Sequence, residues 1–264
     1  MNMSWSFYLQ VFKSMLWADL IELRQTLVSK IINIGIWLSC TIIVMGYIMK
    51  AQFALDPNFG FFMLAGCIAT VGIFETYPRI FTLISDFEGD QVIFYDLTLP
   101  IPSKLVFIKK MLYLTLNFSI MGLFMLPLGK LFLLNQFNMM QVAWIKFVPF
   151  FILINAFYAT FAFLVASFIP SLAQMEQVWI RFIFPLWFLG GFQYSWQTLH
   201  QISKEVSYIA LCNPITYIME GMRAIMLGQD GYLPFWLCFC IISIITVASG
   251  WLAISRLKRR LDFV

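Results

Sequence analysis

Acidic side chains gather among large apolar ones in one stretch of this chain, residues 75–110. The acids are Asp86, Glu88, Asp90 and Asp96. The large apolar residues between and after them are Phe87, Ile93, Phe94, Tyr95, Leu97 and Leu99. Aromatic side chains supply buried area in protein interfaces, and charges orient the partners. The stretch therefore predicts a docking segment for a soluble partner, with an acidic solvated loop as the alternative.

A second group of polar residues lies in the mixed segment 202–233, which is neither apolar enough to span a membrane nor polar enough for a free loop. Asn213 and Pro214 predict a turn that starts a short helix, because proline lacks a backbone donor and disfavours helix at the preceding residue. That helix places Glu220 and Arg223 one turn apart. They form either a local ion pair or a gate at the outer mouth of the molecule.

Other chemistry has little support in the sequence. There is one histidine, His200, and the five cysteines include no CxxC pair, so neither a metal site nor a disulfide framework is predicted. The sequence also has no GxSxG, HExxH, EF-hand, dinucleotide or phosphate-loop motif. We therefore expect no catalytic residue, no cofactor and no ATP site on this chain.

The elements that must position these groups are apolar. The 264 residues are 61% hydrophobic and only 11% charged, with a mean hydropathy of +0.85. This composition excludes soluble enzymes and nucleic-acid-binding modules and favours a membrane protein. Six runs of about 20 residues without Asp, Glu, Lys, Arg or His predict six transmembrane helices in a single domain, residues 1–264. The runs are 31–49, 59–74, 111–129, 147–169, 182–199 and 235–254.

Charge placement sets the expected orientation. Twelve of the 17 lysines and arginines fall on one side of the six-span map, so the positive-inside rule predicts that both termini are cytoplasmic. Residues 1–30 have apolar side chains at spacings of three and four, typical of an amphipathic helix in the membrane interface. Packing on a cytoplasmic partner is the alternative. Segment 202–233 is then an outer re-entrant helical segment, because backbone at membrane depth must be covered by protein.

The fifth run is rich in aromatic residues, which offer large contact areas to apolar or ring-shaped ligands. Phe188 and Phe192 are four residues apart beside Gly190 and Gly191, so we expect them on one helix face. They are the candidates for a substrate path.

At two places the sequence resembles the membrane subunits of type-2 ABC exporters. One is DFEGDQVIFYDLTLPIP, residues 86–102, and the other is NPITYIMEGMRAIMLG, residues 213–228. The resemblance implies a permease in a bacterial inner membrane that forms a homodimer, or pairs with a related permease, and docks ATPase subunits carrying ATP and Mg. The substrate would be amphipathic or lipid-linked: a glycan, a lipid or a drug.

By the same resemblance, Asp86, Glu88, Asp90 and Asp96 would couple to the ATPases, and charge reversal at Glu88 or Asp96 would uncouple hydrolysis from transport without unfolding. Asn213, Pro214, Glu220 and Arg223 would form the outer gate. Two alternatives stay open. One is a membrane scaffold without transport, and the other is an ion-coupled transporter, which the charge-free runs disfavour.

Overall fold

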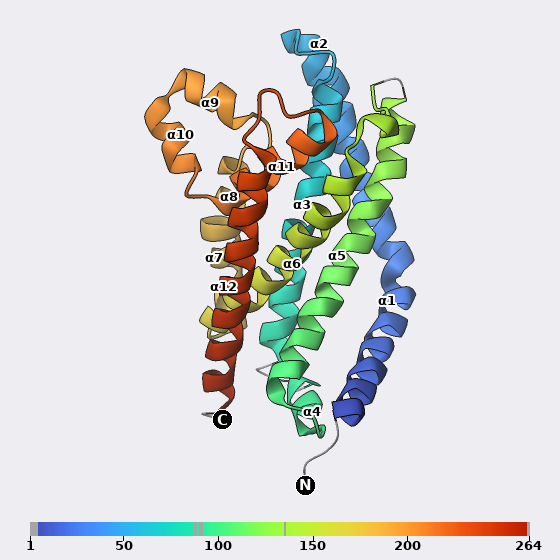
Figure 1. The fold of residues 1–264 in the computed structure, drawn as a ribbon, viewed down its shortest axis with the longest axis vertical. Coiled ribbons are helices and arrows are strands. Elements are labelled where there is room, and N and C mark those ends of the chain that lie inside the picture. Colours follow the sequence, from blue (N-terminus) through green and yellow to red (C-terminus); the bar gives the residue numbers. More distant parts are fainter. Residues whose placement is uncertain (1–4, 87–88, 90–91, 135, 263–264) are drawn as a thin grey trace.

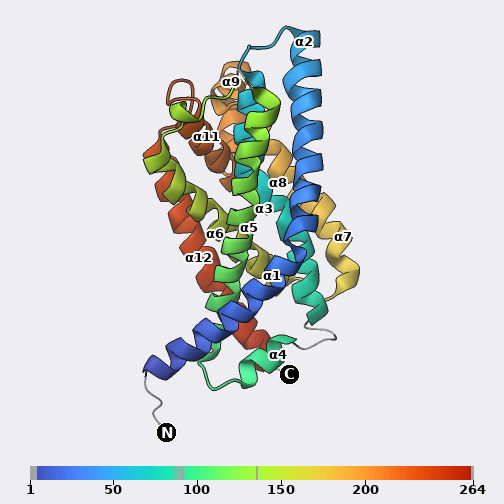
Figure 2. The same cartoon turned by 90° about the vertical axis from the view of Figure 1, so that its right-hand side faces the viewer.

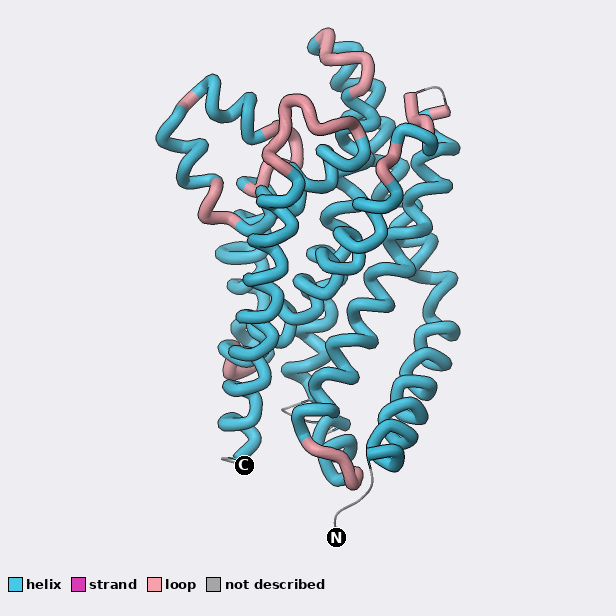
Figure 3. Tube along the Cα trace, viewed as in Figure 1, coloured by secondary structure: helices cyan, strands magenta, loops and turns pink. Residues whose placement is uncertain are grey.

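The computed structural model describes residues 5–86, 89, 92–134 and 136–262, and every element in these ranges is a helix (Figure 3). Five helices are long and apolar enough to cross a membrane, which fits a multi-pass membrane protein. They are α1 (Trp5–Thr41) with its continuation through the π-helical η1 (Ile42–Met49) and α2 (Lys50–Phe53), α3 (Phe59–Ser85), α5 (Ser103–Leu133), α6 (Trp144–Phe168) and α12 (Phe235–Asp262).

The long helices form one bundle with two distinct ends (Figure 1). The short helix α4 (Val92–Thr98), the first turns of α1 and the last turns of α12 lie at one end, called here the α4 end. The short helices α9 (Trp196–Ile202), α10 (Lys204–Ala210) and α11 (Pro214–Met226) lie toward the other, called the α11 end. Two 3-10 turns, η3 (Met139–Gln141) and η4 (Leu172–Gln174), precede α6 and α7.

Helix α1 differs from the expected division into an interfacial helix and a separate span. No glycine or proline occurs between residues 5 and 34, so nothing in the sequence interrupts the helix at residue 30. The N-terminal half of α1 runs obliquely past the α4 end, and the second half stands along the bundle (Figure 2). The amphipathic segment and the first span are therefore one bent helix.

The expected fifth span, residues 182–199, is not a single helix. Helix α7 (Met175–Val178) continues through the π-helical η5 (Trp179–Ile183) into α8 (Phe184–Leu189), and helix ends there. Gly191 has φ +86°, a left-handed conformation that glycine adopts at low cost and that interrupts a right-handed helix. Six full spans are therefore not confirmed, and the chain resumes helix only at Trp196.

Helix α3 is the centre of the bundle. In its most apolar 18-residue window 78% of residues are buried, compared with 22% for α1 and 28% for α12. Small residues allow α6 to approach closely: a Cβ added to Gly72 would lie 2.3 Å from Cδ2 and 3.0 Å from Cβ of Tyr158. The hydroxyl of Tyr158 donates a hydrogen bond to the Ala69 carbonyl at 3.1 Å.

Gly72→Ala is expected to lower the stability of the folded protein by about 1–3 kcal/mol, because the new methyl meets the root of a buried ring that cannot turn away. Thermal unfolding of the purified protein measures the change. Gly35→Ala is the matched control, since its methyl would meet only Leu128 at an ordinary 3.7 Å. Equal unfolding temperatures for the two variants would contradict the close α3–α6 contact.

Candidate functional site

Helix α11 begins at Pro214, as the sequence predicts. The Asn213 side-chain oxygen accepts a hydrogen bond from the Ile215 amide at 3.0 Å and caps the helix. The side-chain amide of Asn213 donates to the Leu186 carbonyl at 2.7 Å. Asn213 therefore fixes the start of α11 to α8 as well as capping it.

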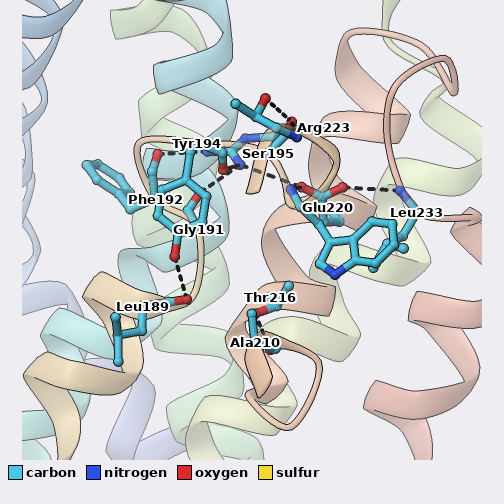
Figure 4. Close-up of polar contacts among 12 residues, drawn as sticks. Leu189, Gly191, Phe192, Tyr194, Ser195, Ala210, Thr216, Glu220, Arg223 and Leu233 are labelled. Carbon is cyan, nitrogen blue, oxygen red and sulfur yellow. Dashed lines mark hydrogen bonds and ion pairs between the residues drawn. The ribbon is translucent and has the colours of Figure 1, made fainter. Parts of the chain in front are cut away.

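Arg223 binds the loop that follows α8 (Figure 4). Its Nη1 donates to the carbonyls of Gly191 and Tyr194 at 2.7 and 2.8 Å, and its Nη2 donates to the Phe192 carbonyl at 2.7 Å. The guanidinium also lies over the Phe62 ring, 3.6 Å from the centroid, and the side chain is completely buried. One arginine thus holds the three carbonyls that the break after α8 would otherwise leave without helix partners.

Glu220 holds two other segments. Its Oε1 accepts from the Trp196 amide at 2.9 Å, at the first residue of α9, and its Oε2 accepts from the Leu233 amide at 3.1 Å, just before α12 (Figure 4). The direct Glu220–Arg223 ion pair is longer, 3.9 Å. We call these contacts the Glu220–Arg223 clamp, because the two side chains join segments 191–196 and 233 to α11.

Burial sets the electrostatics of the clamp. Loss of water raises the pKa of the Glu220 carboxyl above its ordinary value, while the Trp196 and Leu233 amides and the charge of Arg223 act in the opposite direction. Burying the charge of either Glu220 or Arg223 without the other would therefore lower the stability of the fold. The local Glu220–Arg223 ion pair is present, but the shorter bonds of both side chains go to backbone groups of other segments of the chain. The alternative role, a gate at the outer mouth, stays a prediction.

Phe188 and Phe192 do not share a helix face, because the helix ends between them at Leu189. Phe188 is 46% exposed and stacks on Phe184, whereas Phe192 is buried and its ring packs on Trp187 at 4.8 Å between centroids. Phe188 and Phe192 are separated by the helix break after α8, where the Phe192 carbonyl accepts a hydrogen bond from Arg223. As a pair they do not line a common surface.

At the α4 end, Asp86 accepts a hydrogen bond from the Ile93 amide at 3.0 Å and so joins the end of α3 to α4. Asp96 lies 3.1 Å from the ammonium of Lys110 and 3.5 Å from that of Lys109. Lys109, which is only 2% exposed, also pairs with Asp19 of α1 at 2.8 Å. These ion pairs fasten α4 to α5, and α5 in turn to α1.

Not all of the acidic side chains of residues 86–96 are therefore available to bind a partner protein. Asp96 is occupied by lysines of its own chain, and the buried Ile93 packs into the core. Among the α4 side chains that the structure describes, Tyr95 is the large one that is exposed, at 69%. Glu88 and Asp90 lie outside the described residues.

A polar contact inside the bundle was missed by the sequence reasoning, which treated its charges as flanking residues. Lys30 of α1 donates to the Asn117 side-chain oxygen of α5 at 3.1 Å and lies 3.9 Å from the Glu75 carboxylate of α3. The lack of glycine and proline between residues 5 and 34 could have predicted this contact. It implies a continuous helix through residue 30, which places Lys30 between α1, α3 and α5.

Neither a comparison with models of protein families nor one with curated proteins finds a match for this chain. The resemblance at residues 86–102 and 213–228 consequently stays a prediction.

Proposed function

We propose that this chain is the permease subunit of an ATP-driven ABC exporter of the bacterial inner membrane, with the α4 end facing the cytoplasm. It pairs with a second permease, identical or related, and docks separate ATPase subunits that hold ATP and Mg. The substrate is amphipathic or lipid-linked. The chain itself binds no nucleotide and carries no catalytic residue.

The observation that carries this proposal is the anchoring of α4. Asp86 joins this short helix to α3, and the ion pairs of Asp96 join it to α5, whose Lys109 in turn binds α1. A partner that pushes on α4 therefore pushes on three long helices together. Such rigid coupling suits a transporter driven from outside the membrane by the closure of an ATPase pair.

The proposed transport function does not need the six complete spans that the sequence predicts. In the proposal, α7 to α8 enters the bilayer without crossing it fully, since its 15 residues from Met175 to Leu189 reach only about 22 Å at 1.5 Å per residue. Helices α9 to α11 complete this region as the re-entrant segment, and the Glu220–Arg223 clamp closes the bundle at its outer end.

The test is purification of the tagged full-length protein from its native membranes, followed by mass spectrometry of bound chains and measurement of ATP hydrolysis in liposomes. We expect an ATPase to co-purify and its hydrolysis to rise when the permease is present. Tyr95→Ala should reduce the apparent affinity of the two chains about 30-fold, as loss of an interface aromatic worth ~2 kcal/mol does.

Tyr208→Ala is the matched control, because Tyr208 is also exposed, 60%, but lies on α10 at the α11 end. It should leave the hydrolysis rate unchanged. Absence of a co-purifying ATPase, or equal effects of the two tyrosine variants, would contradict the proposal.

One observation favours a second candidate, ion-coupled transport. Lys30 and Glu75 form an ion pair between two helices long enough to span the membrane, where ionisable residues are usually functional. In liposomes that contain this protein alone, an ion-coupled transporter would accumulate its substrate when a pH gradient is imposed, and Glu75→Gln would abolish that uptake. The exporter proposal expects no uphill uptake by either protein in the absence of the ATPase.

A further inference from the structure

A mixed-charge cavity of about 350 Å³ lies between α1, α3 and α5 near the α4 end. This volume falls in the range of small-molecule sites, ~300–1,000 Å³. Its polar lining comes from all three helices and comprises Asp19, Glu22, Arg79, Thr82, Ser85, Asp86, Lys110 and Tyr113.

Most charges around this cavity are already engaged. Asp19 binds Lys109, Lys110 binds Asp96, and Asp86 accepts from the Ile93 amide. Glu22 and Arg79 differ: among the residues that the structure describes, neither has an oppositely charged side chain within 4.0 Å. Arg79 hydrogen-bonds Tyr113, so the cavity holds one carboxylate and one guanidinium that each lack an oppositely charged partner among the described residues.

The rest of the wall is mostly apolar. Phe81, 47% exposed, lines the cavity beside Leu114 and Phe163. A ligand held here therefore meets charged and apolar side chains together.

These features together define the chemistry of the ligand. A group with a separated ammonium and phosphate would satisfy Glu22 with the one and Arg79 with the other, because guanidinium binds phosphate strongly. Three acids and two bases in the lining disfavour a purely anionic group. Arg79, which has no carboxylate within 4.0 Å among the described residues, disfavours a simple cation. We infer that the cavity binds the headgroup of a zwitterionic phospholipid such as phosphatidylethanolamine, whose acyl chains lie on the exposed Phe81 of α3.

This inference rests on the cavity and on the membrane-spanning helices, and it does not depend on the proposed transport. The test is a native mass spectrometry titration of delipidated full-length protein with phosphatidylethanolamine and with phosphatidylglycerol of identical acyl chains. We expect at least tenfold tighter binding of phosphatidylethanolamine. Arg79→Gln should weaken that binding at least tenfold, and Glu22→Gln should remove the preference over phosphatidylglycerol.

Arg24→Gln is the matched control, because Arg24 is an exposed arginine two residues from Glu22 that does not line the cavity. It should bind both lipids as the unsubstituted protein does. If Arg79→Gln does not fold, Glu22→Gln carries the test, since Glu22 is exposed.

Equal binding of the two lipids by the unsubstituted protein, or an unchanged preference in Glu22→Gln, would overturn the inference. O-phosphoethanolamine alone distinguishes the source of the headgroup. Binding as tight as that of the lipid would identify a soluble zwitterion as the ligand and overturn the lipid assignment, whereas binding at least tenfold weaker supports it.

Discussion

Arg223→Gln is expected to destabilise the folded protein by about 3–5 kcal/mol, because removing one partner of a buried charge pair leaves the other uncompensated. Glu220 would remain 1% exposed without its counter-charge, and the carbonyls of Gly191, Phe192 and Tyr194 would lose their donors. A loss of this magnitude is a large fraction of the ~5–15 kcal/mol by which most proteins are stable.

Thermal and denaturant unfolding of detergent-purified protein would measure this loss. The matched control is Arg181→Gln, because Arg181 is exposed and makes a single side-chain hydrogen bond, to Gln177. Arg223→Lys should fall between the two, since a lysine keeps the charge but lacks the planar fork that reaches three carbonyls. An Arg223→Gln protein as stable as Arg181→Gln would show that the clamp does not hold the fold.

The structure also changes what an exchange of the two charges can reveal. From the sequence, a protein with Glu220→Arg and Arg223→Glu should stay active if only a local ion pair matters. The actual partners are carbonyls for Arg223 and amides for Glu220, so exchange places a cation against donors and an anion against acceptors. We expect the exchanged protein to misfold even if no second subunit touches this region.

The parts of the fold that sequence predicts well are those set by local properties. Apolar runs without charge predicted the helices α3, α5, α6 and α12, because helix is the structure that satisfies the backbone within a long apolar segment. The Asn213–Pro214 pair predicted the start of α11, because its cap is a contact between neighbouring residues.

The parts that it predicts poorly depend on contacts between distant residues. Residues 182–199 carry no charged side chain, like the other runs, yet the helix ends at Leu189, where the loop carbonyls meet an arginine about thirty positions later in the chain. In the same way Lys109 lies 90 residues from Asp19, and Lys30 lies 87 from Asn117. The positions of charges in the sequence show only that such residues lie near the ends of the predicted spans. They do not indicate which residues they contact.

Lys109→Met is the second substitution with a large expected effect, about 2–3 kcal/mol of lost stability. Methionine keeps the apolar stem of this buried side chain but removes the ammonium between Asp19 and Asp96. The two carboxylates remain 22% and 13% exposed, so water relieves part of the cost, and Asp96 retains Lys110. Helix α4 should become mobile relative to α1, which hydrogen exchange of its backbone would detect.

The control for Lys109→Met is Lys104→Met, an exposed lysine of the same helix. A double-mutant cycle with Asp19→Asn isolates the pair, and we expect the double variant to lose less stability than the sum of the single losses.

If α4 transmits force from an ATPase, Lys109→Met should also lower stimulated hydrolysis while the partner chains still bind through Tyr95. Charge reversal at Asp96 should disturb folding and coupling together, because both lysine pairs are lost at once. Full stability in Lys109→Met would show that α4 is held by its apolar contacts instead.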